Sequence, residues 1–392
     1  MKNGRKWSVA IFFAGTVGTA HAQSSVTLYG VFDQGVLAAT NVHGGHVYQS
    51  SSGWLSGSRW GMRGTEDLGG GAQAIFVLEN GFDGSSGAAL QGGREFGRMA
   101  YVGLANPYGK LTFGRQYDMV VDHLAYLGMT SEIWGGAFAC HPGDVDNLCN
   151  SRRMDNSVKY SSPTFNGLSF GAAYSLGGTP GAFSHGSIWT VGADYTKGPL
   201  SIGVGYFNVN SPNTVSYGGS AVSGATTSFT NGMSASPAIS GFATANRQET
   251  LAAGANYTIG SSTVGASYSY TRFDDLGAFH VVGSPSLSGN ARLQNAEVRY
   301  AINVTPFLLA GIAFHYTTVG SVGGISGARY RQLNLGLNYS LSKRTSLYAV
   351  FAAQSANGMD STGKSAVAAM AFVSPSSSNR QAAAQIGIRH RF

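Results

Sequence analysis

Apolar and polar residues alternate with a period of two along most of this chain, and this pattern restricts the fold more than any other feature. In 333–341 every odd position is apolar and every even position is small or polar, and 168–176 and 308–316 also present one apolar face. Successive side chains of a strand point to opposite faces, so such alternation predicts strands. Helical spacing is rare, and we therefore expect an all-β protein.

The first 22 residues read as a leader rather than as part of the fold. Three basic residues precede an apolar segment, 9–17, and the Ala-His-Ala triplet that ends at Ala22 has the form of a cleavage site. The apolar segment is too short to span a bilayer, so a secretory signal peptide over 1–22 is predicted. The alternative is a buried N-terminal helix. We expect an exported chain, 23–392, that folds as one domain.

The composition is unusual for a soluble domain. The chain has 57 glycines and only 11% charged residues, whereas soluble domains have about 25%. No run of about 18 apolar residues follows the leader, so no membrane-spanning helix is expected. These features together predict a transmembrane β-barrel, in which closure of the sheet pairs every backbone polar group within lipid. The polar strand faces suit a water-filled lumen.

Short and long connections alternate along the chain, which allows the strands to be counted. Seven short turns rich in Gly, Pro and Asn lie at 68–70, 106–109, 164–167, 196–199, 259–261, 303–306 and 341–344. Eight longer loops lie at about 41–52, 83–93, 118–152, 178–187, 211–246, 275–290, 320–329 and 355–379. Fifteen connections join sixteen antiparallel strands. The last strand, which ends on Phe392, is expected to close the barrel against the first, which begins near Ser25.

The connection 118–152 differs from the other loops because it is long, acidic and aromatic. We expect it to fold back into the barrel and to narrow the lumen. It carries both cysteines of the chain, Cys140 and Cys149, for which an oxidising compartment favours a disulfide over free thiols. Their spacing, with His141 as the one nearby histidine, is a poor zinc signal. The low-complexity stretch 211–245 reads as a flexible outer loop.

Several short motifs resemble the general diffusion porins of Gram-negative outer membranes, most closely the β-proteobacterial ones. They are VTLYG, SRWGMRGTEDLGGG at 58–71, AIFVLENGF at 74–82, FGRMAYVGL at 96–104, GKLTFGRQY at 109–117, NSVKY at 156–160 and the terminal Phe. The resemblance covers essentially the whole mature chain. It implies a trimeric sixteen-stranded barrel in outer-membrane lipid and lipopolysaccharide, with the third loop folded into the lumen.

The resemblance also implies a constriction in which wall arginines face acidic groups of the third loop. The family's arginine positions match Arg59, Arg98 and Arg153, with Arg152 as a register alternative for the last. The acidic position of the loop matches Glu132 in SEIWGG, although this chain has Ser where many relatives have Pro and one extra residue before the glycines. Further constriction residues are expected at Arg63, Arg115, Lys159, Asp118 and Asp122.

Strand parity tests these assignments independently. Arg59 and Arg63 alternate with Trp60 and Met62, and the same reasoning places Arg98, Arg153 and Lys159 on the inner face. Arg115 shares the parity of Leu111 and Phe113, so it faces inward only if a bulge intervenes. An arginine facing lipid near the bilayer midplane would cost about 2–4 kcal/mol, which favours inward placement.

No catalytic set accompanies the barrel pattern. The histidines are scattered, no G-x-S-x-G motif accompanies Asp122 and His123 in the connection 118–152, and His43 and His46 are expected in a solvated loop. We expect no enzyme activity, cofactor or metal. The chain has a modest net charge of +7 and no basic run with interleaved aromatics, so no nucleic-acid partner is expected.

The resemblance and the residues together predict passive diffusion of small hydrophilic solutes and ions. An excess of arginine over carboxylate in the constriction predicts a mild anion preference. Two alternatives remain: a substrate-selective channel for an organic anion, and an adhesin or enzyme anchored by its barrel.

Overall fold

A computed structural model describes residues 25–128, 134–223 and 228–392. The predicted signal peptide and Glu132 lie outside the described residues. The described helices are all short: α1 (Leu90–Gly93), α2 (Met119–Leu124), η1 (Ala125–Leu127), η2 (Gly136–Ala139), η3 (Pro142–Asp144), α3 (Pro212–Val215) and η4 (Ser240–Phe242). Within the part of the chain that the structure describes, no helix has the length and apolar character needed to cross a bilayer.

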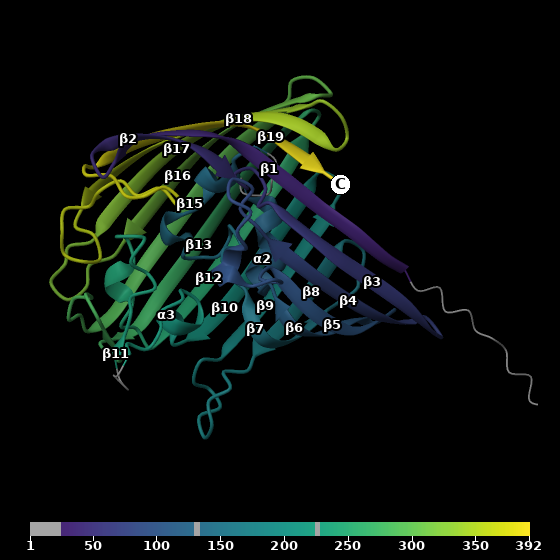
Figure 1. Cartoon of the computed structure of the whole chain (residues 1–392), viewed down its shortest axis with the longest axis horizontal. Helices are drawn as coiled ribbons and strands as arrows, with labels where there is room; N and C mark the ends of the chain where they lie inside the picture. Colours follow the sequence, from purple (N-terminus) through teal and green to yellow (C-terminus); the bar gives the residue numbers. More distant parts are fainter. Residues whose placement is uncertain (1–24, 129–133, 224–227) are drawn as a thin grey trace, which may run out of the picture.

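One closed antiparallel sheet forms the body of the molecule (Figure 1). Its strands are β1 (Ser25–Val42), β2 (Gly45–Ser52), β3 (Arg59–Gly69), β4 (Ala72–Gly81), β5 (Met99–Asn106), β6 (Gly109–Gln116), β7 (Met154–Ser161), β8 (Leu168–Ser175), β9 (Ile188–Lys197), β10 (Leu200–Asn210), β12 (Arg247–Ile259), β13 (Ser262–Leu276), β15 (Gly289–Asn303), β16 (Leu308–Val319), β17 (Ala328–Ser340), β18 (Thr345–Gly358) and β19 (Arg380–Arg391). The short strands β11 (Ser228–Phe229) and β14 (His280–Val281) pair separately.

The 17 strands of the sheet make a sixteen-stranded barrel. β1 pairs with β3 over 25–31 and with β2 over 34–42, so β2 and β3 are the two halves of one long strand that is interrupted at 53–58. The barrel closes where β1 pairs with β19, and the backbone N–H and C=O of Phe392 bond those of Gly30 at 3.1 and 3.0 Å. The predicted fold and its closure are therefore confirmed.

All seven predicted short turns join consecutive strands, whereas one of the eight predicted loops is wrong. Residues 41–52 form a tight hairpin around His43 and Gly44, both with positive φ, and β2 follows directly. The irregular backbone lies instead at 53–58. The Ser-rich sequence of β2 resembles a loop in composition, but its backbone pairs with β1 and needs no apolar face there.

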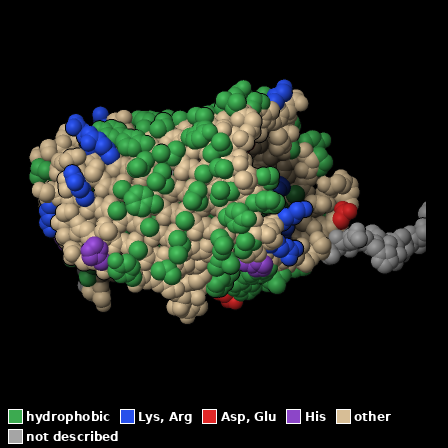
Figure 2. Space-filling model, turned by 90° about the horizontal axis from the view of Figure 1, so that it is seen from above, with side chains coloured by type: hydrophobic (Ala, Val, Ile, Leu, Met, Phe, Trp, Pro, Cys, Tyr) green, Lys and Arg blue, Asp and Glu red, His purple; other side chains and the backbone are tan. Residues whose placement is uncertain are grey.

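The apolar strand faces point away from the lumen. In β17, Leu333, Leu335 and Leu337 are exposed while Gln332 and Asn334 are buried. Figure 2 shows hydrophobic side chains over much of the outer wall, with Lys and Arg near its two ends. This arrangement reverses that of a soluble barrel and suits a wall surrounded by lipid.

The connection between β6 and β7, here called loop 3, folds into the barrel as predicted. Its helix α2 lies within the ring of strands and packs on the inner faces of β8, β9, β10 and β12 (Figure 1). Glycines make this approach possible: a Cβ at Gly205 would lie 2.8 Å from the Cα of Val120, and one at Gly192 would lie 2.8 Å from the carbonyl oxygen of Met119. Trp134 of the same loop packs on Gly311 of β16. Loop 3 therefore contacts two different regions of the wall.

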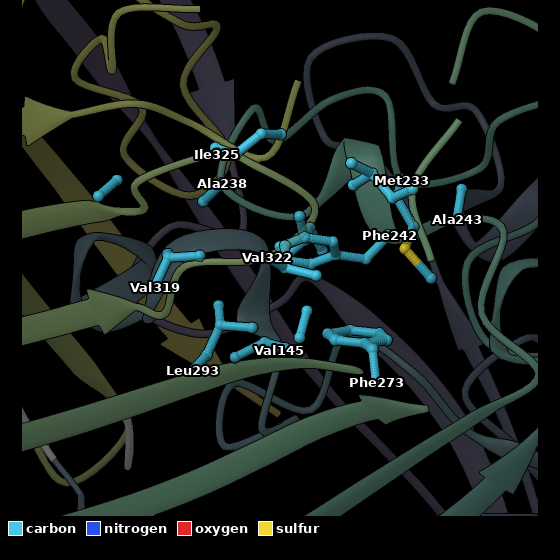
Figure 3. Close-up of a cluster of buried hydrophobic side chains, with 14 of the residues drawn as sticks. Val145, Met233, Ala238, Phe242, Ala243, Phe273, Leu293, Val319, Val322 and Ile325 are labelled. Carbon is cyan, nitrogen blue, oxygen red and sulfur yellow. The ribbon is translucent and has the colours of Figure 1, made fainter. Parts of the chain in front are cut away.

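The outer loops fill part of one barrel mouth. Met233 and Phe242 of the 211–246 loop pack with Val145 of loop 3 and with Phe273 and Leu293 of the wall (Figure 3). The prediction of a flexible 211–245 loop is therefore wrong for its described residues beyond 228, because scattered apolar side chains among the serines anchor them.

Candidate functional site

Three arginines converge on the inner wall, and they are called the arginine cluster here: Arg59, Arg98 and Arg153. Arg59 begins β3, whereas Arg98 and Arg153 directly precede β5 and β7. The carboxylate of Glu79 on β4 lies between the first two, with its oxygens 3.8 Å from Arg59 Nε and 2.7 Å from Arg98 Nε. Tyr29 donates a hydrogen bond to the same carboxylate at 3.0 Å.

Tyr117 links the other side of the cluster. Its phenolic oxygen accepts hydrogen bonds from Arg98 Nη2 at 2.8 Å and from Arg153 Nη2 at 3.2 Å. The guanidinium of Arg153 also lies 5.0 Å from the centre of the Tyr117 ring, within cation–π range. Two cations thus share one neutral acceptor, which fixes their side chains without neutralising their charge.

The arginine cluster faces loop 3 across a cavity of about 260 Å³, here called the gap. All three arginines line one part of it, and the Cys140–Cys149 disulfide, Asn150 and Ser151 line another. The predicted disulfide is therefore present, with its Cα atoms 5.6 Å apart. Wall arginines and the disulfide-bearing part of loop 3 meet at one point in the lumen.

Residues 53–58, here called the inserted segment, form a third side of the gap. The buried carboxylate of Asp33 accepts backbone hydrogen bonds from Leu55 at 2.9 Å and Ser56 at 2.7 Å. Trp54 packs edge-on against Phe138 of loop 3, with ring centres 4.9 Å apart. The inserted segment between β2 and β3 therefore packs against loop 3 and supports it from the barrel wall.

Arg115 has the bulge that inward placement requires. The β6–β7 register shifts between Gly114 and Gln116, and Gly114 has φ of +133°. Arg115 pairs with Asp155 and donates to the carbonyl of Gly97 at 2.8 Å. It therefore lies beside the arginine cluster in an ion pair and does not line the gap.

The remaining predicted residues lie outside the gap. Arg63 is exposed, with its guanidinium 5.5 Å from the Tyr29 ring centre. Lys159 pairs with Asp122 of α2, which ties the helix to β7. Asp118 is the N-cap of α2 and accepts from Val121 N at 3.0 Å. Burial raises the pKa of this carboxyl group.

Sequence reasoning missed Glu79, Tyr117 and the inserted segment. Glu79 could have been predicted from the sequence. Counting back from the short turn after β3 pairs Arg59 with Gly81 and Gly61 with Glu79, which puts the carboxylate on the same face as the arginines. Tyr117 follows a bulged strand, and the inserted segment interrupts a strand, so neither follows from parity.

The barrel with an apolar exterior, a polar lumen and an inward loop opposite arginines defines a channel of the porin class. A family model of Gram-negative porins matches residues 8–358. The chain belongs to this family and is an integral protein of the Gram-negative outer membrane.

Individual relatives agree with this assignment. Outer membrane porin protein 32 of Delftia acidovorans is 28% identical over 99% of this chain and 100% of its own length. An outer membrane porin protein of Bordetella pertussis is 36% identical over 53% of this chain, and the match spans 60% of the relative. The solved anion-selective porin from Comamonas acidovorans has the same fold, with a TM-score of 0.68 at 24% identity over 94% of this chain and 100% of that one.

Proposed function

We propose that this protein is a general porin, a water-filled channel for passive diffusion of small hydrophilic solutes and ions with a mild preference for anions. The observation that carries the proposal is the gap, where the arginine cluster faces the disulfide of loop 3. A ring of charged side chains at the narrowest point sets ion selectivity, and its width sets the size limit.

The charges of the gap support the anion preference. Among the described residues, its lining includes three arginines and no carboxylate, and Glu79 offsets one of these charges from behind. Two unit charges 10 Å apart interact by about 0.4 kcal/mol in bulk water and by several-fold more beside low-dielectric walls. A passing anion is therefore favoured over a cation by a modest factor. The Comamonas relative, named for anion selectivity, supports the same reading.

Trimer assembly in outer-membrane lipid and lipopolysaccharide is part of the proposal. The early strands present apolar side chains outward, among them Leu28, Val102 and Leu104, and an apolar outer face can be covered either by lipid or by a second subunit. A trimer form is recorded for OmpT of Vibrio cholerae, a structure with a TM-score of 0.61 at 15% identity. Residues 1–22 would be removed on export, before assembly.

Planar-bilayer recording in a KCl gradient tests this function. The expected result is a large ohmic conductance that appears in groups of three equal steps. The reversal potential should lie closer to the equilibrium potential of chloride than to that of potassium. Replacing Arg59 and Arg98 by Ser should move the reversal potential toward potassium. Arg344→Ser, in the short turn before β18 and far along the chain from the gap, is the matched control and should leave the potential unchanged. A small conductance that is blocked by one organic anion would favour a substrate-selective channel. The absence of any conductance would favour an adhesin or enzyme anchored by its barrel.

A further inference from the structure

A cluster of three metal-ligand side chains lies where loop 3 meets the barrel wall. His141 comes from loop 3, Glu297 from β15 and His315 from β16. Each is no more than 3% exposed, and one ligand atom from each lies within 4.8 Å of the other two. The three residues are far apart in the sequence, and only the docking of loop 3 brings them together.

The spacing within this cluster approaches that of a bound metal. His315 Nε2 lies 3.3 Å from Glu297 Oε2. With zinc–ligand distances of about 2.0–2.1 Å, neighbouring ligands of a tetrahedral site lie about 3.3–3.4 Å apart. The rings of His141 and His315 meet edge to face with centres 5.2 Å apart. Small side-chain rotations would bring the third ligand atom to the same spacing.

Two of the ligand atoms are buried without a hydrogen bond. His141 Nε2 has no hydrogen-bond partner in the described structure, and His315 Nε2 has only its 3.3 Å ion-pair contact with Glu297, which does not have the geometry of a hydrogen bond. A buried polar nitrogen without a hydrogen bond costs free energy, so this arrangement is unfavourable unless something binds both atoms. A metal ion is such a partner, because imidazole nitrogen is a preferred ligand of zinc.

The groups behind the ligands already orient them. The Nδ1 of His141 lies 2.6 Å from a carboxylate oxygen of Asp146, and Ser269 of the wall donates to the same oxygen at 2.5 Å. Metal-bound histidines commonly hold such a carboxylate on the other ring nitrogen. Arg299 donates to Glu297 Oε1 at 2.7 Å, so the second carboxylate oxygen faces His315.

We propose that His141, Glu297 and His315 bind one Zn²⁺ ion, with water as the fourth ligand, and thereby fasten loop 3 to β15 and β16. Two imidazoles and one carboxylate suit zinc, whereas calcium and magnesium prefer oxygen ligands alone. His141 directly follows Cys140, whose disulfide lines the gap. The metal would therefore hold the loop side of the gap at a fixed distance from the arginine cluster.

Metal content after refolding tests the site. The mature chain is refolded in detergent with ZnCl₂ or with EDTA, the folded fraction is isolated by gel filtration, and zinc is measured by mass spectrometry. About one zinc per chain is expected in the first sample, with at least a tenfold loss in His315→Ala. The double variant His43→Ala, His46→Ala is the matched control, since both side chains are exposed on the first hairpin, and it should retain the zinc.

The absence of zinc from the refolded wild type would overturn the proposal. Equal zinc content in His315→Ala and in the wild type would also overturn it, as would a loss of zinc from the hairpin double variant alone. If His315→Ala does not refold, Glu297→Gln and cobalt substitution of the wild type replace it. Co²⁺ in the wild type should give the strong visible absorption of a tetrahedral site, and a weak octahedral spectrum would equally overturn the site. None of these outcomes depends on ion selectivity.

Discussion

Replacing Glu79 by Gln should raise the anion preference of the channel while it weakens the fold. The carboxylate lies 2.7 Å from Arg98 and 3.8 Å from Arg59, and its side chain is only 4% exposed. Glutamine keeps the volume and can still accept from Tyr29, but it removes the one negative charge between the two arginines. The wall of the gap then gains one net positive charge.

The magnitudes follow from this geometry. Removing one partner of a buried ion pair costs about 3–5 kcal/mol, and we expect about 3 because the gap is wet on one side. For selectivity, an ion that passes at an assumed distance of about 7 Å from this carboxylate changes in energy by about 0.6 kcal/mol in water when the charge is removed, in favour of chloride. That energy corresponds to about a threefold change in partition.

Two assays separate these effects. The same charge change favours chloride and disfavours potassium by about threefold each, so reversal potentials in a KCl gradient should show the chloride-to-potassium permeability ratio rising about eightfold. Urea unfolding in detergent should show the lower stability. Glu66→Gln removes the same charge from an exposed position near the C-terminal end of β3. It should change neither the permeability ratio nor the stability. An unchanged permeability ratio in Glu79→Gln, in a variant that still forms channels, would refute the assigned position of this carboxylate.

Three further predictions concern loop 3. Replacing Cys140 and Cys149 by Ser should cost about 2–3 kcal/mol, as expected for a bridge across a separation of 9 residues, and should increase open-channel current noise. Gly205→Val should displace α2, because its Cβ would lie 2.8 Å from Val120 Cα, and protease cleavage within loop 3 should then become detectable. Gly45→Val is the control for added bulk, because a Cβ there would make only an ordinary 3.7 Å contact with the carbonyl oxygen of Val42. Burial raises the pKa of Asp118, so its contribution to stability is fully present below the unfolded pKa of about 3.8 and is lost as pH rises through the folded value. Thermal unfolding from pH 4 to 8 should show this slope in the wild type and lose it in Asp118→Asn.

The sequence predicted the barrel because two local signals repeat along the chain. Alternation set the faces of strands such as β17, and turn residues set the seven short connections. The hairpin at His43 was missed because a serine-rich strand has the composition of a loop. Part of the 211–246 loop was misread for a related reason: Met233 and Phe242 are too widely spaced to form a pattern, yet they meet in one cluster.

The site was predictable only where it lies on regular strands. Parity placed Arg59 and Arg98 on the inner face, and it also indicated that Arg115 needed a bulge, which the structure contains. Parity does not extend to Tyr117 or to the inserted segment, since both lie where strand geometry ends. The cluster of His141, Glu297 and His315 has no local signature, because its spacing arises from long-range contacts alone.

The central claim is that ion flow is limited where the arginine cluster faces loop 3, and a charged label placed there tests it most directly. Gly57 lines the gap, and a Cβ at this position would lie 3.1 Å from Arg98 Nη1. We predict that labelling Gly57→Cys with a sulfonate-bearing methanethiosulfonate lowers single-channel conductance by more than half and moves the reversal potential toward potassium, whereas labelling Ser342→Cys in a short turn changes neither. Full labelling of Gly57→Cys with unchanged conductance and reversal potential would contradict the account.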